Sequence, residues 1–535
     1  MSNIYKLFLI SIPYGIYILL TYMDSVWFFF GEIDIYRWII IIGFLLHCFY
    51  FIILLKFEMY DYLQKNIVGI FFSIICLLGF ILFPIQNLNL GDGILLIENA
   101  ILENLAYGYT VVPDEILEGL IHSVIYNFIK YKSYNPMLSY RIVSTLIGGI
   151  FLISLYVIFN KEKSYSLVIL LFMCQGGSLF FYGYTENYTV VSLFIFLTIL
   201  YGFNKIHKKD FRIISIINIS LLAGLSAITH LISGFMILGL IYFCIIASSS
   251  TKKIYKIIYN PKFYKNALIA CTTAFLIILP IYAYFIFISD LRIEIGLAHA
   301  THPPFLSPKK IFSINHIKDL ALEAIFMILP MAFILKYVYF TEKKIIKNII
   351  IKKEFLFVVL IFIGFFIHFF TYNPLLGYPA DWDLMGFIWI PIFVFVIYLI
   401  KEYQNPFYEN IPLFLTFYII ILYNAYNLRT TESDAKRIYF LEESIQEFLV
   451  DYKKNESEID PKYKKSYLHT GYFLFRTNKK IKQSGDEELL KRNVSLQKEF
   501  EGGEILKDRE KWKVFLNNAT EFHLLYLKRI EKNHK

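Results

Sequence analysis

The chain has 535 residues, of which 57% are hydrophobic and 19% aromatic, and it carries a formal net charge of +9. A soluble protein cannot bury so large an apolar fraction, whereas apolar runs of about 20 residues match the hydrocarbon core of a bilayer. The basic residues are not interleaved with aromatic residues in a recognisable module, so the charge does not indicate nucleic-acid binding. Composition therefore predicts an all-α polytopic membrane protein.

About thirteen apolar runs along the chain have the length and composition of transmembrane helices. The first run lacks a small-residue cleavage site and is interpreted as a retained anchor. All five cysteines lie inside apolar runs, which indicates packing residues rather than disulfides or a metal site. The approximate centres of the runs are Tyr14, Leu46, Ile75, Ile150, Cys174, Phe196, Leu222, Gly239, Phe275, Leu329, Phe362, Phe393 and Ile419.

Charge alternates between successive loops. One set is rich in Lys and Arg, and the intervening loops are acidic. The positive-inside rule places the basic set, together with the N-terminus, in the cytoplasm, and the acidic loops outside. The basic loops contain Lys56 and Lys65, Lys161 and Lys163, Lys205 to Arg212, Lys252 to Lys265, and Lys343 to Lys353; the acidic ones contain Asp24 to Asp34, Asp92 to Glu118, Glu186, Asp290, and Asp381 with Asp383.

The first long external loop, residues 87–140, is predicted to contain two interfacial helices, from Gly93 to about Leu105 and from Asp114 to Lys130. Asp92 lies between Gly91 and Gly93, just before the first of these helices. Flanking glycines permit a sharp turn and the close approach of a ligand, and acids at a membrane boundary are functional candidates. The alternative is that Asp92 is only a helix N-cap.

Other candidate residues lie in the remaining external loops. Glu186 occupies a short turn between two apolar runs, where the alternative is a solvated turn residue. His230 lies in another short turn, where the alternative interpretation is a hydrogen-bonded packing residue. Arg141 and Arg292 are cations suited to a phosphate group, or equally to lipid headgroups.

The sequence Asp381-Trp-Asp383 stands at another predicted external boundary. Two carboxylates with this spacing can share a divalent cation such as Mg²⁺ or Mn²⁺, because hard cations prefer oxygen ligands. The pattern is common by chance, and its functional interpretation depends on its position at the membrane boundary. Glu186 is the third ligand we predict for such a cation.

Composition changes abruptly near Asn427, after which the chain is strongly charged. Residues 429–535 are therefore predicted to form a soluble, mainly helical C-terminal domain. Thirteen spans with the N-terminus inside would place this domain outside the cell, and twelve or fourteen would place it in the cytoplasm. The predicted domains are residues 1–66 with two N-terminal spans, residues 67–428 with the candidate site, and residues 429–535.

Residues 67–428 resemble the GT-C superfamily of membrane glycosyltransferases, which use polyprenyl-phosphate-linked sugars and include protein O-mannosyltransferases, oligosaccharyltransferases and the lipid A aminoarabinose transferase. The resemblance rests on Gly91-Asp92-Gly93 at the start of the long loop, on its two interfacial helices, and on Glu186 in the next external loop. In most of the family this loop follows the first span. Here it follows the third, so the two N-terminal spans would be an addition.

The resemblance implies an inverting transfer in which an acceptor hydroxyl or amine attacks the anomeric carbon and polyprenyl phosphate leaves. Asp92 would be the catalytic base; Glu186, Asp381, Asp383, Arg141, His230 and Arg292 would bind substrate, with the external cations or a divalent cation stabilising the phosphate. The competing interpretations are an O-antigen ligase or polysaccharide polymerase, and a transporter. A transporter would be expected to show inverted repeats and acids near mid-membrane.

Overall fold

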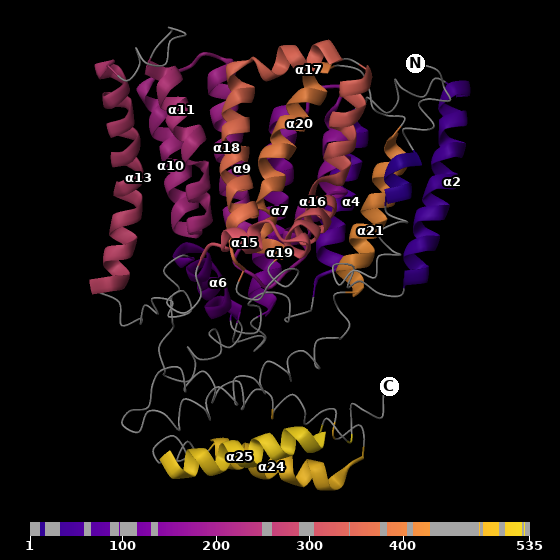
Figure 1. Cartoon of the computed structure of the whole chain (residues 1–535), viewed down its shortest axis with the longest axis vertical. Helices are drawn as coiled ribbons and strands as arrows, with labels where there is room; N and C mark the ends of the chain where they lie inside the picture. The colour runs from indigo at the N-terminus through magenta and orange to yellow at the C-terminus, as the bar shows by residue number, and fades with distance from the viewer. Residues whose placement is uncertain are drawn as a thin grey trace. The chain divides into compact units, whose positions relative to one another are not determined.

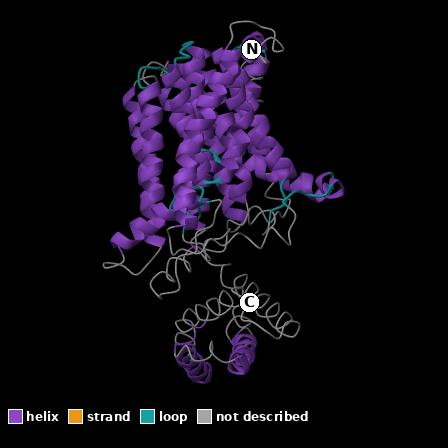
Figure 2. Cartoon of the chain, turned by 90° about the vertical axis from the view of Figure 1, so that its left-hand side faces the viewer, coloured by secondary structure: helices purple, strands orange, loops and turns teal. Residues whose placement is uncertain are grey.

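The computed structural model describes residues 11–16, 33–57, 66–85, 96, 115–129, 137–248, 259–287, 304–341, 343–374, 382–403, 410–427, 474, 481, 485–501, 509–526 and 529. These residues are almost all helical, and within them no strand occurs beyond one isolated bridge between Phe305 and Tyr372 (Figure 2). The chain folds into two compact units, Met1–Arg429 and Thr430–Lys535.

The helices of the first unit are α2 (Ile33–Phe57), α4 (Asn66–Leu82), α6 (Ile116–Ile129), α7 (Met137–Phe159), α8 (Tyr165–Met173), η2 (Gly176–Phe181), α9 (Thr189–His207), α10 (Ile213–Thr229), η3 (Leu231–Met236), α11 (Ile237–Ser248), α13 (Pro261–Phe287), α15 (Pro308–Ile311), α16 (Ile314–Thr341), α17 (Lys343–Ile350), α18 (Lys353–Thr371), α19 (Trp382–Met385), η4 (Gly386–Ile388), α20 (Trp389–Tyr403) and α21 (Ile411–Asn427). The second unit contains α24 (Glu487–Glu501) and α25 (Arg509–Tyr526), which pack against each other.

Seven helical segments in the described part of the chain are long and apolar enough to cross a membrane. They are 138–159, 189–207, 231–248, 261–284, 314–340, 353–371 and 382–402. Five shorter apolar helices accompany them, and α2, α4, α10 and α21 among these correspond to further predicted runs. The chain is therefore a polytopic helical membrane protein. The total of thirteen spans stays a prediction.

The helices of the first unit stand side by side in a bundle (Figure 1). At one edge α13 packs on α10 and α11, and at the other α2 packs on α21. Between these edges, α9 contacts α7, α10, α18 and α20, while α8 contacts α4, α7 and α21. The more central elements, such as α8, α9 and α20, bury most of their residues, because their side chains face other helices rather than the surroundings.

The basic and acidic turns lie at opposite ends of this bundle. Polar contacts at one end join neighbouring basic turns, including Lys401 to Glu162 at 2.8 Å and Lys352 to Glu402 at 2.7 Å. The described acids Glu115, Glu118, Glu186 and Asp383 lie at the end that contains α6, α15 and α19 (Figure 1). The sequence predicts that this second end faces away from the cytoplasm.

The run predicted as a span around Cys174 is not one continuous helix. It consists of the nine-residue α8, whose residues are all buried, and the 3₁₀ helix η2. The break falls at Gln175, whose extended backbone lets its side chain accept a hydrogen bond from Gly177 N at 3.0 Å. A Cβ on Gly176 would lie 2.7 Å from the Phe326 carbonyl oxygen, so close helix packing requires glycine here.

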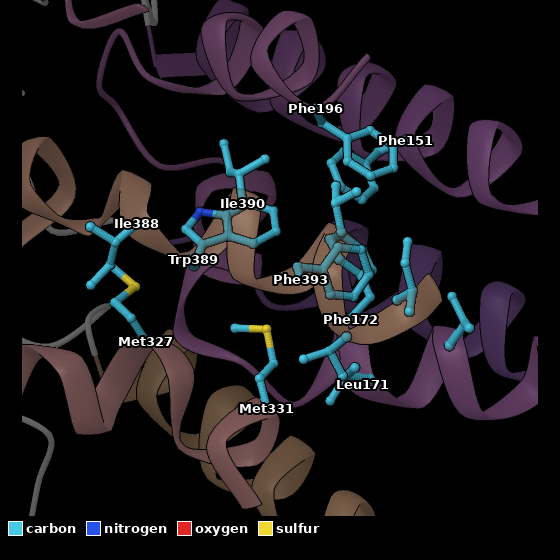
Figure 3. Close-up of a cluster of buried hydrophobic side chains, with 14 of the residues drawn as sticks. Phe151, Leu171, Phe172, Phe196, Met327, Met331, Ile388, Trp389, Ile390 and Phe393 are labelled. Carbon is cyan, nitrogen blue, oxygen red and sulfur yellow. The ribbon is translucent and has the colours of Figure 1, made fainter. Parts of the chain in front are cut away.

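Aromatic side chains pack among aliphatic residues and methionines in the bundle core (Figure 3). The Phe151 ring stacks on Phe172 at 4.6 Å and on Phe196 at 4.0 Å between ring centroids. The Trp389 ring lies 5.9 Å from those of Phe151 and Phe393. Rings from α7, α8, α9 and α20 thus meet in one cluster, which fixes the elements that carry the candidate site.

Candidate functional site

The candidate site is organised by the turn that joins η2 to α9, residues 182–188, which is buried throughout. Gly183 adopts φ +72°, a left-handed conformation that glycine reaches without strain. A Cβ on Gly183 would also lie 2.9 Å from Cγ of Arg141, so the start of α7 packs directly on the turn. The backbone N–H of Ile85, after α4, donates to the Tyr182 carbonyl at 2.7 Å.

Tyr184 connects the turn to Asp383 on α19. Its hydroxyl donates to Asp383 Oδ2 at 2.8 Å, and Asp383 Oδ1 accepts from the backbone N–H of Leu384 at 2.8 Å. Burial raises the pKa of the Tyr184 hydroxyl well above its usual range, and the nearby carboxylates of Asp383 and Glu186 raise it further. Glu186 is 3% exposed and Asp383 1%, so Glu186 is not a solvated turn residue.

Glu118, on α6, binds the N-terminus of α9. Its two carboxylate oxygens accept hydrogen bonds from Val190 N at 2.9 Å and from Val191 N at 3.3 Å. The first N–H groups of a helix have no partner within the helix, and the helix dipole favours an anion there. Glu118 is completely buried, so these contacts join the helix from the long loop to α9 inside the protein.

Glu115, just before α6, makes a second connection to the turn and to η3. It accepts a hydrogen bond from Asn187 Nδ2 at 2.7 Å, and its other oxygen lies 3.2 Å from His230 Nε2. His230 Nδ1 accepts from the backbone N–H of Ile232 at 3.0 Å. Because Nδ1 is an acceptor, Nε2 carries the ring proton and directs this N–H toward Glu115.

Four of the seven predicted site residues lie in the described part of the chain, and all four meet at the 182–188 turn or its immediate partners. Glu186 belongs to the turn, Arg141 packs on Gly183, Asp383 accepts from Tyr184, and His230 reaches the turn through Glu115. His230 also fits the alternative interpretation of a hydrogen-bonded packing residue. The predicted residues Asp92, Asp381 and Arg292, and the first interfacial helix, lie outside the described residues.

The second predicted interfacial helix corresponds to α6, which begins at Ile116 and packs on α7 and α10. The sequence predicted an acidic loop from Asp92 to Glu118 but assigned neither Glu115 nor Glu118 a role in the site. Their spacing contains the indication: the two acids are one helical turn apart, so both lie on the same face of the predicted helix, which faces the protein interior. Their partners, in the 182–188 turn, in the first turn of α9 and at His230, are far away in the sequence, so periodicity alone does not find them.

The described residues of the site supply only part of a divalent-cation site. Within the described residues, no group of three His, Cys, Asp or Glu side chains is placed to hold a metal ion. Both oxygens of Asp383 already accept hydrogen bonds. The predicted cation with Asp381, Asp383 and Glu186 as ligands stays a prediction, and no chemical step below is derived from it.

Comparison with known proteins yields little. No family model and no curated protein matches the chain. One solved structure is similar, the crystal structure of ArnT from Cupriavidus metallidurans in the apo state, with 11% sequence identity and a TM-score of 0.39 over 85% of this chain and 74% of that chain. A TM-score below 0.5 does not establish a common fold, so the function is argued from the site.

Proposed function

We propose that the protein is a membrane glycosyltransferase that transfers a sugar, with inversion, from a polyprenyl-phosphate-linked donor to an extracytoplasmic glycan, lipid or protein acceptor. The supporting observation is the group of buried acids at one end of a transmembrane bundle. Glu118, Glu186 and Asp383 are each no more than 3% exposed, and Glu115 is nearby. Ionisable residues are rarely kept inside a membrane protein without a functional reason.

Asp92 is the proposed general base. It would accept the proton of the acceptor hydroxyl or amine as that group attacks the anomeric carbon, and the bond from that carbon to the phosphate oxygen would break. The residues that flank its loop support this role: Ile85 hydrogen-bonds to Tyr182, and Glu115 to Asn187. The loop that carries Asp92 therefore leaves and rejoins the bundle at the same buried turn.

Arg141 and Arg292 are the proposed partners of the departing phosphate. A guanidinium group presents several N–H donors in a fork that matches phosphate oxygens. The stem of Arg141 crosses Gly183, which places this cation beside the turn that contains Glu186. A negative charge that develops on the leaving group is stabilised by a cation already held in place.

The position of the acids favours this proposal over a transporter. A transporter would hold its acids near the middle of the bilayer at the interface of two repeats. Here Glu118 and Asp383 lie at the ends of helices, beside the first turn of α9 and in α19. An O-antigen ligase or polysaccharide polymerase is expected to have an arginine-rich late external loop, whereas the segment 290–322, predicted as the late external loop, contains one arginine, Arg292.

The proposal is tested by incubating purified protein in lipid nanodiscs with radiolabelled polyprenyl-phosphate sugars and a membrane extract as acceptor. Transfer by the wild type should fall by about 10²-fold or more in Asp92→Asn, as expected when a general base is lost. Asp290→Asn, an acid in a different predicted external loop, is the matched control and should transfer normally. Absence of transfer from every donor, or full activity of Asp92→Asn, would reject the proposed reaction.

Topology provides a second test. A cysteine introduced at Asp290 should react with a membrane-impermeant maleimide from outside intact cells, and one at Lys163 should not, because the positive-inside rule places these loops on opposite sides. Reaction at Lys163 alone would place the acidic end of the bundle in the cytoplasm and contradict an extracytoplasmic active site.

A further inference from the structure

Three buried side chains, on the 182–188 turn, on η3 and on α18, each contain a polar atom with no hydrogen-bond partner among the described residues. The atoms are Asn187 Oδ1, Ser233 Oγ and His368 Nδ1, and each of the three residues is 3% exposed. Buried polar atoms in proteins are nearly always paired with protein, water or ligand. Three unpaired atoms in one region therefore indicate that a polar molecule binds there.

The three residues come from elements that contact one another: α18 packs on η3, and the turn is linked through Glu115 to His230, which directly precedes η3. Asn187 donates through its Nδ2 to Glu115 at 2.7 Å, which leaves its Oδ1 as an acceptor. Ser233 lies on η3, and its backbone N–H donates to the His230 carbonyl at 3.2 Å. His368, one turn before the end of α18, packs its ring on Phe235 of η3 at 4.8 Å.

The unpaired atoms differ in hydrogen-bonding character. Asn187 Oδ1 only accepts, Ser233 Oγ donates and accepts, and His368 Nδ1 does either according to its tautomer. None of them carries a formal charge, so they suit a neutral ligand with several groups that both donate and accept. Tyr188, with its ring 5.3 Å from His230, adds an aromatic surface beside them. Hydroxyl groups on a sugar ring have this combination of polar edges and an apolar face.

We infer that Asn187, Ser233 and His368, held around the Glu115–His230 pair, form a subsite for the hydroxyl groups of a sugar ring. The inference rests on the proposed function and specifies which residues would bind the transferred or accepting sugar. The donor and the acceptor both supply sugar hydroxyls, so the two sources are separated by experiment.

The test measures binding of two ligands to the full-length protein in nanodiscs: polyprenyl phosphate, and the same lipid carrying glucose, mannose or galactose. The dissociation constant of bare polyprenyl phosphate divided by that of the glycosylated lipid isolates the contribution of the sugar to binding, and we call this quotient the sugar ratio. Ser233→Ala should reduce the sugar ratio by about 2-fold to 10-fold, because one hydrogen bond to the sugar is lost. It should leave the dissociation constant of bare polyprenyl phosphate unchanged. Thermal stability without ligand should not fall, since no group in the described part of the chain pairs with this hydroxyl.

Ser215→Ala is the matched control. Ser215 is also fully buried, and its hydroxyl also has no partner among the residues that the structure describes. It lies, however, in the first turn of α10, which starts at the basic turn 208–212. It should not change the sugar ratio. At His368, asparagine places an amide near the position of Nδ1, whereas glutamine places it near Nε2. His368→Asn should therefore retain more sugar binding than His368→Gln.

The outcomes distinguish the two proposals and the two ligand sources. If the wild type prefers none of the glycosylated lipids and transfers no sugar, the glycosyltransferase proposal fails. If the wild type transfers sugar, an effect of Ser233→Ala on the donor ratio assigns the subsite to the donor, and an increase only in the acceptor KM assigns it to the acceptor. Normal donor binding and normal acceptor KM in Ser233→Ala and His368→Gln would overturn the subsite, and the unpaired atoms would then bind only water.

Discussion

Replacing Glu118 by glutamine tests whether this buried acid holds α6 to α9. The carboxylate accepts hydrogen bonds from two backbone N–H groups of the first turn of α9, at 2.9 and 3.3 Å, and is completely buried. Glutamine keeps one acceptor oxygen but presents its amide N–H₂ to the other N–H donor. One hydrogen bond is lost, two donors face each other, and the charge near the helix terminus disappears.

The expected loss follows from these two effects. A buried donor without a partner costs about 1–3 kcal/mol, and a partly buried charge at a helix terminus contributes up to about 2 kcal/mol. We expect Glu118→Gln to lower the free energy of unfolding by about 2–4 kcal/mol. In a unit of this size that change corresponds to a fall of several degrees in the apparent unfolding temperature.

Tryptophan fluorescence during heating of the detergent-solubilised protein measures the effect. Glu162→Gln is the matched control, because Glu162 forms a partly exposed ion pair with Lys401 at 2.8 Å, and surface pairs contribute at most about 1 kcal/mol. If Glu118→Gln unfolds at the same temperature as the wild type and the control, the Glu118 carboxylate does not anchor α9 and the argument is wrong.

Two further predictions concern the elements around the site. Gly177→Ala should destabilise the protein by about 1–3 kcal/mol in the same assay, because its Cβ would overlap the Trp389 indole. Gly234→Ala is the control and should be nearly neutral, because the space around Gly234 is open. Equal effects of the two substitutions would contradict the packing at η2. The raised pKa of Tyr184 means that its hydroxyl keeps its proton in the folded protein above about pH 10, whereas the unfolded chain loses it. The folded state therefore binds more protons in this range, and the free energy of unfolding falls as pH rises. Tyr184→Phe should show a smaller decline in unfolding temperature between about pH 9 and about pH 11, and an identical decline would show that the tyrosine ionises normally when folded.

The membrane character and the helical segments of the bundle could be predicted from the sequence, because both depend on local hydrophobicity. The runs centred on Phe196 and Leu222 correspond to α9 and α10. The run around Cys174 has a similar composition but is broken, and the Gln175-Gly176-Gly177 sequence contains the reason. Hydropathy does not register that break, since glycine is compatible with an apolar run and its role depends on Phe326 and Trp389 from distant helices.

The contacts of the candidate site could be predicted only in part. Charge alternation grouped Glu186 and Asp383 in one set of loops, and the structure places both beside Tyr184. Glu118 on α6 accepts hydrogen bonds from the first turn of α9, because helix orientation and packing decide which N-terminus a carboxylate reaches. Such a partner is a tertiary property that the spacing of residues along one helix does not contain.

The irregular backbone of this protein is itself an argument for where its function lies. Backbone that leaves the helical pattern within a membrane protein must be buried in protein or line a polar space, because lipid cannot satisfy its hydrogen bonds. The break at Gln175 and the 182–188 turn are both buried, and they lie at the two ends of the same 3₁₀ helix. Contacts from α6, α7 and α19 converge on the turn at its far end. A bundle required only to span the membrane would continue α8 as a helix; this one stops it early and fills the space with acids, amides and a tyrosine held in fixed positions.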